Sequence, residues 1–221
     1  MPTTSYQIRL CTACGLRYPL TEGHAFGTRC PICMGDTRLI LSRELILEPT
    51  PARHLTPDPS PKRRGELAVL LDNIRSAWNV GSIFRSADGF GFAHAYLCGI
   101  TPTPDNEAVT KTSLGAEDSV TWSYHKDAVK LVKGLKKEGW RVFALEEGVK
   151  AKAIGSYGES RSKTGNKSVL IAGSEVTGVD PELLKLADEI FYIPMRGEKK
   201  SYNVAMAFSI AAYAISTKHT E

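Results

Sequence analysis

The stretch Ile193-Pro-Met-Arg-Gly-Glu-Lys-Lys-Ser-Tyr-Asn-Val-Ala-Met-Ala207 joins a short apolar strand to a long apolar helix. The strand, Phe191 to Ile193, stops at Pro194, and a polar loop with one glycine and three basic residues follows. A helix then begins, and its first turn carries backbone N–H groups that have no partner within the helix. A polar loop that leads into the N-terminus of an apolar helix is a favourable place for a ligand.

The helix after this loop is expected to run from Asn203 to about Ser216, and its residues are almost all apolar. A helix that is apolar all round is typical of a buried position, and its alanines allow close packing. Ser201 and Asn203 are residue types that cap a helix N-terminus, so both are candidates for that role. Taken alone, the segment fits an ordinary strand-to-helix corner better than a ligand site.

Upstream of this stretch, apolar strands and helices alternate from Glu66 onward. The expected strands are 67–71, 94–98, 141–145, 168–172 and 189–193, and the expected helices are 80–87, 127–138 and 181–187, with a long loop after Cys98. Such alternation predicts an α/β domain with a mostly parallel sheet over residues 66–221. Ligands bind beyond the carboxyl ends of the strands in such sheets, where the polar, glycine-bearing segments 72–81, 173–180 and 194–203 fall.

The first two of these segments carry candidate site residues. Arg85, six residues after Asn79, is placed to meet a phosphate or carboxylate, although a surface ion pair with Asp88 is the simpler interpretation of Arg85 alone. Gly173 lets the backbone approach a ligand closely, and the carboxylate of Glu175 accepts hydrogen bonds from a sugar or ammonium group. Neither a G-x-G-x-x-G fingerprint nor a P-loop is present, which argues against a nucleotide-dependent oxidoreductase.

Four of the five cysteines form two C-x-x-C pairs near the N-terminus, Cys11 with Cys14 and Cys30 with Cys33, fifteen residues apart. This spacing predicts a four-cysteine zinc site, which is structural because four thiolates leave no coordination position open. A ribbon as small as residues 1–48 cannot bury a sufficient core, so the metal would supply folding free energy. Two disulfides are the competing interpretation, but nothing in the sequence looks secreted.

Charge is distributed unevenly along the chain, which carries 28 Lys and Arg against 24 Asp and Glu. The ribbon has five basic and four acidic residues, the proline-rich linker 49–65 has four and one, and residues 66–221 have nineteen of each. The excess of basic residues in the ribbon and the linker favours a nucleic-acid partner that binds partly to this N-terminal region. Zinc ribbons also dock proteins or merely cap a domain, and Lys62-Arg63-Arg64 in the linker fits a solvated tether as well as a phosphate contact.

The sequence contains no apolar run of membrane-spanning length. The polar N-terminus, Met-Pro-Thr-Thr-Ser, lacks the apolar core of a signal peptide. We therefore expect a cytoplasmic protein without a membrane partner.

Three stretches in register resemble the TrmH/SpoU branch of the SPOUT methyltransferases. The first motif is Asn79-Val-Gly-Ser-Ile-Phe-Arg-Ser-Ala-Asp-Gly-Phe-Gly91, and the second is Leu170-Ile-Ala-Gly-Ser-Glu-Val-Thr-Gly178. The third motif comprises Ile193-Pro-Met-Arg-Gly197 and Ser201-Tyr-Asn-Val-Ala205. The likeness covers about residues 66–216, and three motifs in order are far more specific than any one of them.

The resemblance implies a SPOUT-type parallel sheet with a C-terminal trefoil knot, an exception to the rule that chains are unknotted. It implies a homodimer that binds S-adenosylmethionine in the knot and methylates a ribose 2′-hydroxyl in structured RNA, tRNA or rRNA. Carried over by position, the residues that would hold the cofactor are Leu145, Gly173, Ile193, Met195 and Tyr202. Arg85 matches the catalytic arginine, and the supporting polar residues are Asn79, Glu175, Ser201 and Asn203.

The residue types suit this chemistry. A ribose hydroxyl is a poor nucleophile at neutral pH, so the enzyme must supply alignment, a proton acceptor and a hold on the phosphate. An arginine keeps its proton at its ordinary pKa. We therefore expect an RNA phosphate to hold Arg85, which then only assists deprotonation.

Two positions depart from the family pattern. Tyr202 stands where leucine is usual in the third motif. It is tolerable if that position contributes mainly backbone contacts, although a tyrosine there can still reshape the adenine pocket. Val176 stands where glycine usually follows Glu175, and it would restrict a turn that requires a positive φ. The alternative to an enzyme is a non-catalytic RNA-binding paralogue in which these two residues spoil the pocket.

Overall fold

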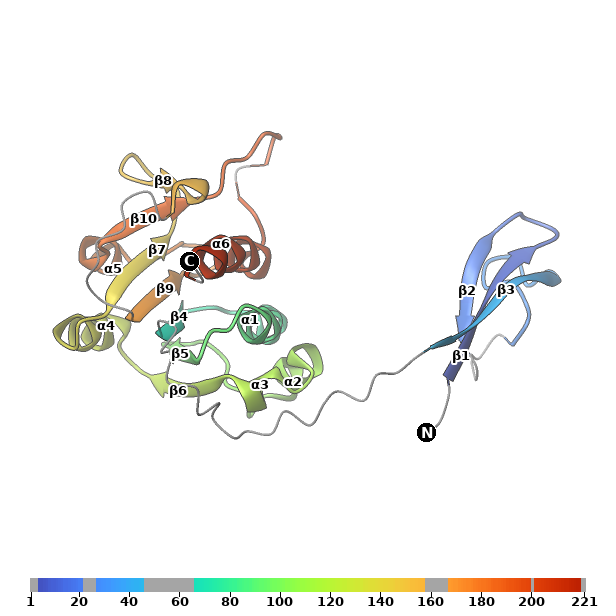
Figure 1. Cartoon of the computed structure of the whole chain (residues 1–221), viewed down its shortest axis with the longest axis horizontal. Coiled ribbons are helices and arrows are strands. Elements are labelled where there is room, and N and C mark those ends of the chain that lie inside the picture. Colours follow the sequence, from blue (N-terminus) through green and yellow to red (C-terminus); the bar gives the residue numbers. More distant parts are fainter. Residues whose placement is uncertain (1–3, 22–26, 46–65, 158–166, 200, 220–221) are drawn as a thin grey trace. The chain divides into compact units, whose positions relative to one another are not determined.

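A computed structural model describes residues 4–21, 27–45, 66–157, 167–199 and 201–219 (Figure 1). The chain divides into two compact units, Met1–Pro59 and Ser60–Glu221. The proline-rich linker 49–65 lies outside the described residues, and so do the predicted domain boundaries at either end of it. The division into ribbon, linker and α/β domain at those positions therefore stays a prediction.

The N-terminal unit is a three-stranded antiparallel sheet with the strand order β2-β1-β3. Its strands are β1 (Thr4–Cys11), β2 (Arg17–Thr21) and β3 (Thr37–Leu45). Among the described residues of this unit, the buried apolar side chains are Cys11, Leu20 and Cys30. So small a core needs a further source of stability.

The C-terminal unit contains a seven-stranded sheet in the order β6-β5-β4-β9-β7-β10-β8, and each pair of neighbouring strands is parallel. In chain order its strands are β4 (Glu66–Asp72), β5 (His94–Cys98), β6 (Thr121–His125), β7 (Arg141–Leu145), β8 (Lys152–Ala153), β9 (Lys167–Ala172) and β10 (Glu189–Tyr192). The central strands β4 and β9 are continuous apolar runs, as expected where both faces of a sheet are covered. The predicted α/β class with a parallel sheet is confirmed.

Helices cover both faces of this sheet (Figure 1). One face carries α1 (Ala77–Gly89), α2 (Glu107–Ser113), α3 (Ala116–Ser119), the 3₁₀ turn η1 (Ile154–Ser156) and α6 (Val204–His219). The other face carries α4 (Ala128–Lys137) and α5 (Pro181–Leu186). None of the described helices is both long and apolar enough to cross a membrane.

The first helix begins three residues before its predicted start. Its first residue is Ala77, because the side chain of Ser76 accepts a hydrogen bond from the backbone N–H of Asn79 at 3.4 Å and caps the helix. Further along α1, a methyl group on Gly81 would overlap the Thr112 hydroxyl of α2. Close packing of α1 on α2 therefore requires a glycine within the first motif.

The segment after β5 differs more clearly from expectation. Residues 107–113 form the helix α2 where a long loop was expected, because Asn106 accepts the N–H of Ala108 at 2.9 Å and caps the helix. The strand β6 follows, and its residues Thr-Trp-Ser-Tyr-His lack an apolar run because the strand lies at the edge of the sheet. Neither element has a strong sequence signal.

The last helix, α6, is apolar without being buried on all sides. Its buried residues are Ala205, Phe208, Ala211, Ala212 and Ile215. Met206, Ile210 and Tyr213 are 56%, 36% and 61% exposed, and their spacing places them on one side of the helix. The prediction of burial all round is therefore wrong for a single chain, since α6 presents an uncovered apolar stripe.

Candidate functional site

A pocket of about 1230 Å³ opens at the carboxyl ends of β7, β9 and β10. Three segments line it: the residues that follow β7, the loop that follows β9, and the connection from β10 to α6. The lining residues are Leu145, Glu146, Glu147, Ala172, Gly173, Ser174, Glu175, Val176, Thr177, Gly178, Tyr192, Ile193, Pro194, Met195, Gly197, Glu198, Lys199, Ser201, Tyr202, Asn203, Val204 and Ala207. This end of a parallel sheet is where ligands bind in open α/β folds.

The loop after β9 folds tightly back on itself. The N–H of Gly178 donates to the carbonyl of Ser174 at 2.9 Å, and Gly178 has a φ of 71° that favours glycine. A side chain at Gly173 would overlap the backbone of Gly178 and Val179. A carboxylate oxygen of Glu146, at the end of β7, accepts the N–H of Val179 at 2.8 Å and holds the loop.

Val176 fits this loop without backbone strain. The non-glycine residues with a positive φ in the described chain are Met34, Asn73 and Leu114, and Val176 is not one of them. Its side chain is 71% exposed, and its N–H donates to the hydroxyl of Ser174 at 3.4 Å. The departure from glycine at this position therefore leaves the turn intact.

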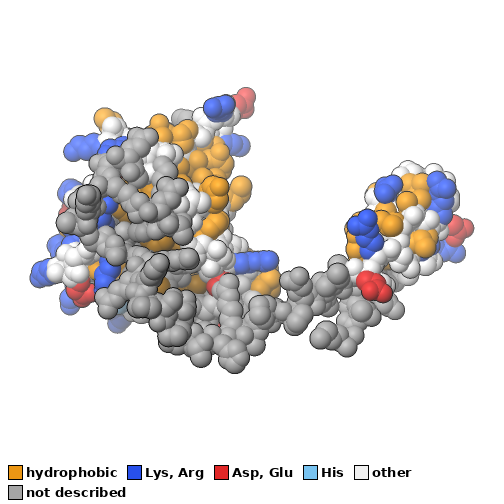
Figure 2. All heavy atoms as spheres, in the orientation of Figure 1, with side chains coloured by type: hydrophobic (Ala, Val, Ile, Leu, Met, Phe, Trp, Pro, Cys, Tyr) orange, Lys and Arg blue, Asp and Glu red, His pale blue; other side chains and the backbone are white. Residues whose placement is uncertain are grey.

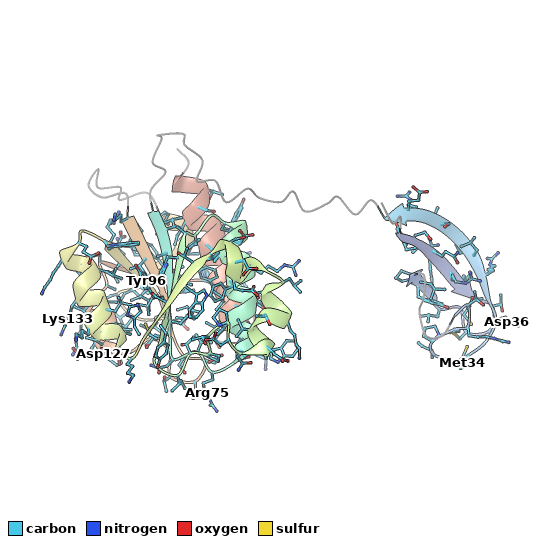
Figure 3. All side chains as sticks on the ribbon, turned by 90° about the horizontal axis from the view of Figure 1, so that it is seen from below. Met34, Asp36, Arg75, Tyr96, Asp127 and Lys133 are labelled. Atoms are coloured by element: carbon cyan, nitrogen blue, oxygen red, sulfur yellow. The ribbon has the colours of Figure 1, made fainter. Side chains whose placement is uncertain are left out.

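Glu175 joins the second motif to the first. Its carboxylate accepts the backbone N–H groups of Arg75 at 2.9 Å and Ser76 at 3.1 Å, and the side-chain amide of Asn79 at 2.8 Å (Arg75 is labelled in Figure 3). Partial burial acts to raise the pKa of Glu175, but these hydrogen bonds outweigh it, and the net shift is downward. An ionised carboxylate thus holds the turn before α1.

Asn79 in turn joins the first motif to the third. Its side-chain oxygen accepts a hydrogen bond from the amide of Asn203 at 3.0 Å. The side-chain oxygen of Asn203 accepts the backbone N–H groups of Ala205 at 2.9 Å and Met206 at 3.4 Å, so Asn203 caps α6. We call the connected side chains of Glu175, Asn79 and Asn203 the motif bridge, since they link all three motifs.

Ser201 does not cap α6. The helix begins at Val204, so the capping position belongs to Asn203, and Ser201 lies two residues too early. The prediction that both residues cap the helix is therefore wrong for Ser201. Ser201 is exposed and borders the pocket.

Most of the predicted site residues meet at the pocket. The residues predicted to hold the cofactor all line it: Leu145, Gly173, Ile193, Met195 and Tyr202. Three of the predicted catalytic residues also line it: Glu175, Ser201 and Asn203. Tyr202, which replaces the usual leucine, is 37% exposed there.

Asn79 and Arg85 lie outside this pocket. Asn79 lines an open groove of about 340 Å³ between α1 and α6, with Ser82, Asn203, Ala205, Met206, Ser209 and Ile210. Arg85, about 9 Å further along the helix axis, is exposed and lines neither cavity. A single chain therefore does not bring Arg85 to the other predicted site residues.

The four N-terminal cysteines lie close together, with all four sulfur atoms within 4.8 Å of one another. The sulfurs of Cys11 and Cys33 are 3.5 Å apart, and those of Cys14 and Cys30 are 3.6 Å apart. All four cysteines are free rather than disulfide-bonded. Thiolates at about 2.3 Å from a tetrahedral zinc ion lie about 3.8 Å apart, so the donor set fits zinc.

Glu146 is a pocket residue that sequence reasoning missed. Besides the N–H of Val179, its carboxylate accepts the N–H of Glu147 at 3.1 Å. A signal was present, since Glu146 directly follows the buried strand β7 at the edge of the sheet where ligands bind.

The motif bridge predicts a pH-dependent contribution to stability. Because the folded pKa of Glu175 lies below the ordinary value of about 4.3, its carboxylate stabilises the fold above that value, and this contribution is lost as the pH falls through the folded pKa. We expect Glu175→Gln to lower the urea midpoint at neutral pH and to differ less from the parent protein in acid. Glu147→Gln, at an exposed neighbouring position, is the control. Equal midpoints for the parent and Glu175→Gln at neutral pH would contradict the role of the bridge.

Comparison with known proteins relates this chain to RNA-modifying enzymes. The chain is 28% identical to the tRNA (guanosine(18)-2′-O)-methyltransferase of Thermus thermophilus, over 69% of this chain and 75% of that protein. It is 29% identical to the 23S rRNA (guanosine(2553)-2′-O)-methyltransferase RlmP of Bacillus subtilis, over 66% of this chain and 56% of that protein.

A solved structure of an AdoMet-bound rRNA methyltransferase from Sinorhizobium meliloti shares the fold, with a TM-score of 0.63 and 24% identity over 71% of this chain and 57% of that one. The model of the SpoU rRNA Methylase family matches residues 66–213, a range that includes all three motifs. The resemblance found in the three motifs is thereby confirmed, and the chain belongs to the SpoU rRNA Methylase family.

Proposed function

We propose that this protein transfers the methyl group of S-adenosylmethionine to a ribose 2′-hydroxyl of tRNA or rRNA. The observation that carries the proposal is the motif bridge, which fixes polar groups from all three motifs beside one pocket. Family membership and the tRNA and rRNA 2′-O-methyltransferases among the relatives support catalysis over the non-catalytic alternative. Val176, which would have weakened the pocket under that alternative, leaves the loop unstrained.

In this proposal the large pocket holds the cofactor, whose sulfonium supplies an electrophilic methyl group when bound. The apolar side chains of Leu145, Ile193 and Met195 are suited to pack against the adenine ring. Gly173 and Tyr202 complete the predicted binding set. The residues fit the group, since they combine an apolar wall with a few polar groups in fixed positions.

The 2′-hydroxyl needs alignment and a path for its proton. Glu175, Asn79 and Asn203 align the pocket edge because their hydrogen bonds to one another leave each side chain little freedom. Arg85 is exposed, and its planar guanidinium can donate two parallel hydrogen bonds to phosphate oxygens, so it would hold the RNA backbone and assist the departure of the hydroxyl proton to water. Ser201 borders the pocket as a further hydrogen-bonding group.

We propose further that the protein is a homodimer. The apolar stripe of Met206, Ile210 and Tyr213 is uncovered in the single chain, as expected of a surface that meets a partner. The groove beside this stripe includes Ser82, and Arg85 follows Ser82 by three residues on the same side of α1. A second copy bound to this surface would therefore lie near Arg85. Arg85 lies outside the pocket of its own chain.

The cysteine cluster is proposed to hold one structural zinc ion. Four converging thiols match zinc in ligand type and in spacing. The backbone N–H of Cys14 donates to the Cys11 sulfur at 3.4 Å, and this hydrogen bond, with others from the backbone and from neighbouring thiols, lowers the pKa of the Cys11 thiol to about 6. The metal would supply the stability that the small ribbon core lacks.

The trefoil knot and the cytoplasmic location remain proposals. In support of the knot, α6 follows β10, which lies beyond β7, and yet packs against α1 beside β4. A chain that returns across its own sheet in this way is compatible with a knot, in which the segment after β10 would pass through a loop. An experimental map traced without a break from β9 through α6 tests it.

Replacing Arg85 tests the catalytic role. We expect Arg85→Ala to lower methyl transfer by roughly 100-fold or more, with unchanged binding of S-adenosylhomocysteine in calorimetry because Arg85 lies outside the pocket. Arg75→Ala is the control, since Arg75 contacts Glu175 through its backbone and its side chain is exposed. Unchanged transfer by Arg85→Ala would exclude the assigned role.

A charge placed on the α6 stripe tests the dimer. We expect the parent chain to sediment at twice its mass of 24.1 kDa, and Met206→Glu to sediment as a monomer, because a buried carboxylate without a partner is costly. Val149→Glu, at a fully exposed apolar position, should leave the mass unchanged. A parent protein that sediments as a monomer at all concentrations contradicts the dimer.

Metal analysis tests the zinc site. One zinc ion per chain is expected in the parent protein, with loss of the metal in Cys33→Ser and full retention in Cys98→Ala, since Cys98 is buried in the other unit. The α/β unit should still bind S-adenosylhomocysteine after zinc is lost. A metal-free parent protein with reactive thiols would contradict the assignment.

A further inference from the structure

One face of the N-terminal ribbon carries three arginines around a row of apolar and aromatic side chains. Leu10 on β1 lies opposite Arg17 on β2 and Arg38 on β3, and Tyr6 lies opposite Arg43 on β3. Directly opposed residues share a face of an antiparallel sheet, and so do residues separated by an even number along one strand. The three arginines therefore lie on the same face as Tyr6.

The centre of this face is apolar. Ile8, between Tyr6 and Leu10, lies opposite Pro19 on β2 and Leu41 on β3. The β1 residues are half-buried, whereas the flanking arginines on the two edge strands are exposed. Figure 2 shows basic and apolar side chains side by side on this unit. We call the surface formed by Tyr6, Ile8, Leu10, Arg17, Arg38 and Arg43 the arginine face.

The arginines of this face are not used by the fold. Within the described parts of the chain, Arg17, Arg38 and Arg43 make no side-chain hydrogen bond and no ion pair. Arg9 on the opposite face differs, since it donates to Thr37 and Gln7 through all three guanidinium nitrogens.

No described strand residue of the arginine face is acidic. The acidic strand residue Glu44 lies opposite Ser5, one residue out of step with Tyr6, and thus on the other face. The arginine face therefore carries positive charge that is not neutralised within the described part of the ribbon, and this charge favours an anionic partner.

The arrangement distinguishes among anionic partners. The two edge strands lie about 10 Å apart, so Arg17 and Arg38 are spaced to grip separate groups rather than a single carboxylate. Tyr6 lies at the other end of the face, opposite Arg43. An aromatic ring on the same face as separate cations suits unpaired RNA, whose phosphates bind arginine and whose bases stack on aromatic side chains. We propose that the arginine face binds the RNA substrate, with Arg17, Arg38 and Arg43 on phosphates and Tyr6 stacked on an unpaired base.

This inference rests on the proposed function, which makes RNA the substrate. It goes further in assigning recognition to the ribbon as well as to the pocket. An acidic protein would also bind the arginines, but it would gain little from the aromatic ring of Tyr6. The two partners therefore predict different results for Arg and Tyr substitutions.

The test measures binding of bulk tRNA to the full-length chain by filter retention across a salt series. Because each contact with a single-stranded phosphate contributes about 0.7 to the slope of log K against log salt, Arg17→Gln/Arg38→Gln/Arg43→Gln should flatten the slope by about 2 and weaken binding about 100-fold at about 0.1 M salt. Lys130→Gln/Lys133→Gln/Lys137→Gln removes the same charge from exposed positions on α4 and is the control. Equal losses in both variants would show a net-charge effect and overturn the proposal.

Tyr6 gives an independent readout. Loss of one stacked base should weaken binding roughly 5- to 150-fold in Tyr6→Leu, with the salt slope unchanged, whereas Tyr6→Phe should retain parental affinity. Zinc content equal to that of the parent shows that each variant ribbon is folded. Parental affinity in both Tyr6→Leu and the arginine variant would overturn the proposal and leave the face to another partner.

Methyl transfer separates this inference from the proposed function. If both hold, the arginine variant should raise KM for RNA and leave kcat and S-adenosylhomocysteine binding unchanged. A parent chain that binds RNA through the arginine face but transfers no methyl group would sink the proposed function alone. A parent chain that transfers methyl groups with unchanged KM in the arginine variant would sink this inference alone.

Discussion

The motif bridge is the constraint on which the arrangement of the α/β unit depends. Glu175 follows β9, Asn79 lies in the first turn of α1 and Asn203 precedes α6, so three elements far apart in sequence meet through two side-chain hydrogen bonds. Hydrogen bonds to an ionised carboxylate are stronger than those between neutral groups. The bridge thus fixes the ends of two helices to one loop, and the pocket keeps its outline because all three are tied.

Much of the fold was readable because its signals are local. The buried strands β4 and β9 are short, uninterrupted apolar runs, and a parallel sheet covered on both faces produces that pattern. The edge strand β6 and the helix α2 were missed for the converse reason. The residues of β6 and α2 are partly exposed, so their sequences show no regular spacing of apolar residues. The N-terminus of α2 also depends on a single capping side chain.

The site residues that belong to motifs at strand ends were predictable from the sequence. The residues whose position depends on how helices pack in three dimensions were not. Gly173, Ile193, Met195 and Tyr202 meet at one pocket because the carboxyl ends of neighbouring strands lie together. The placement of Arg85 away from that pocket has no signature in the sequence, since it depends on how α1 is rotated against α6. The same is true of Ser201 and Asn203, two capping residue types of which only one lies next to the first helical residue.

The cap on α6 also changes which ligand charges its N-terminus favours. Unoccupied N–H groups at a helix start attract anions, and Asn203 already engages those of Ala205 and Met206. The N-terminus of α6 therefore binds a phosphate less strongly than an uncapped helix would. If the pocket holds the proposed sulfonium cofactor, it gains from this cap, because a positively charged group is repelled less beside an N-terminus whose amides are shielded by a side-chain oxygen.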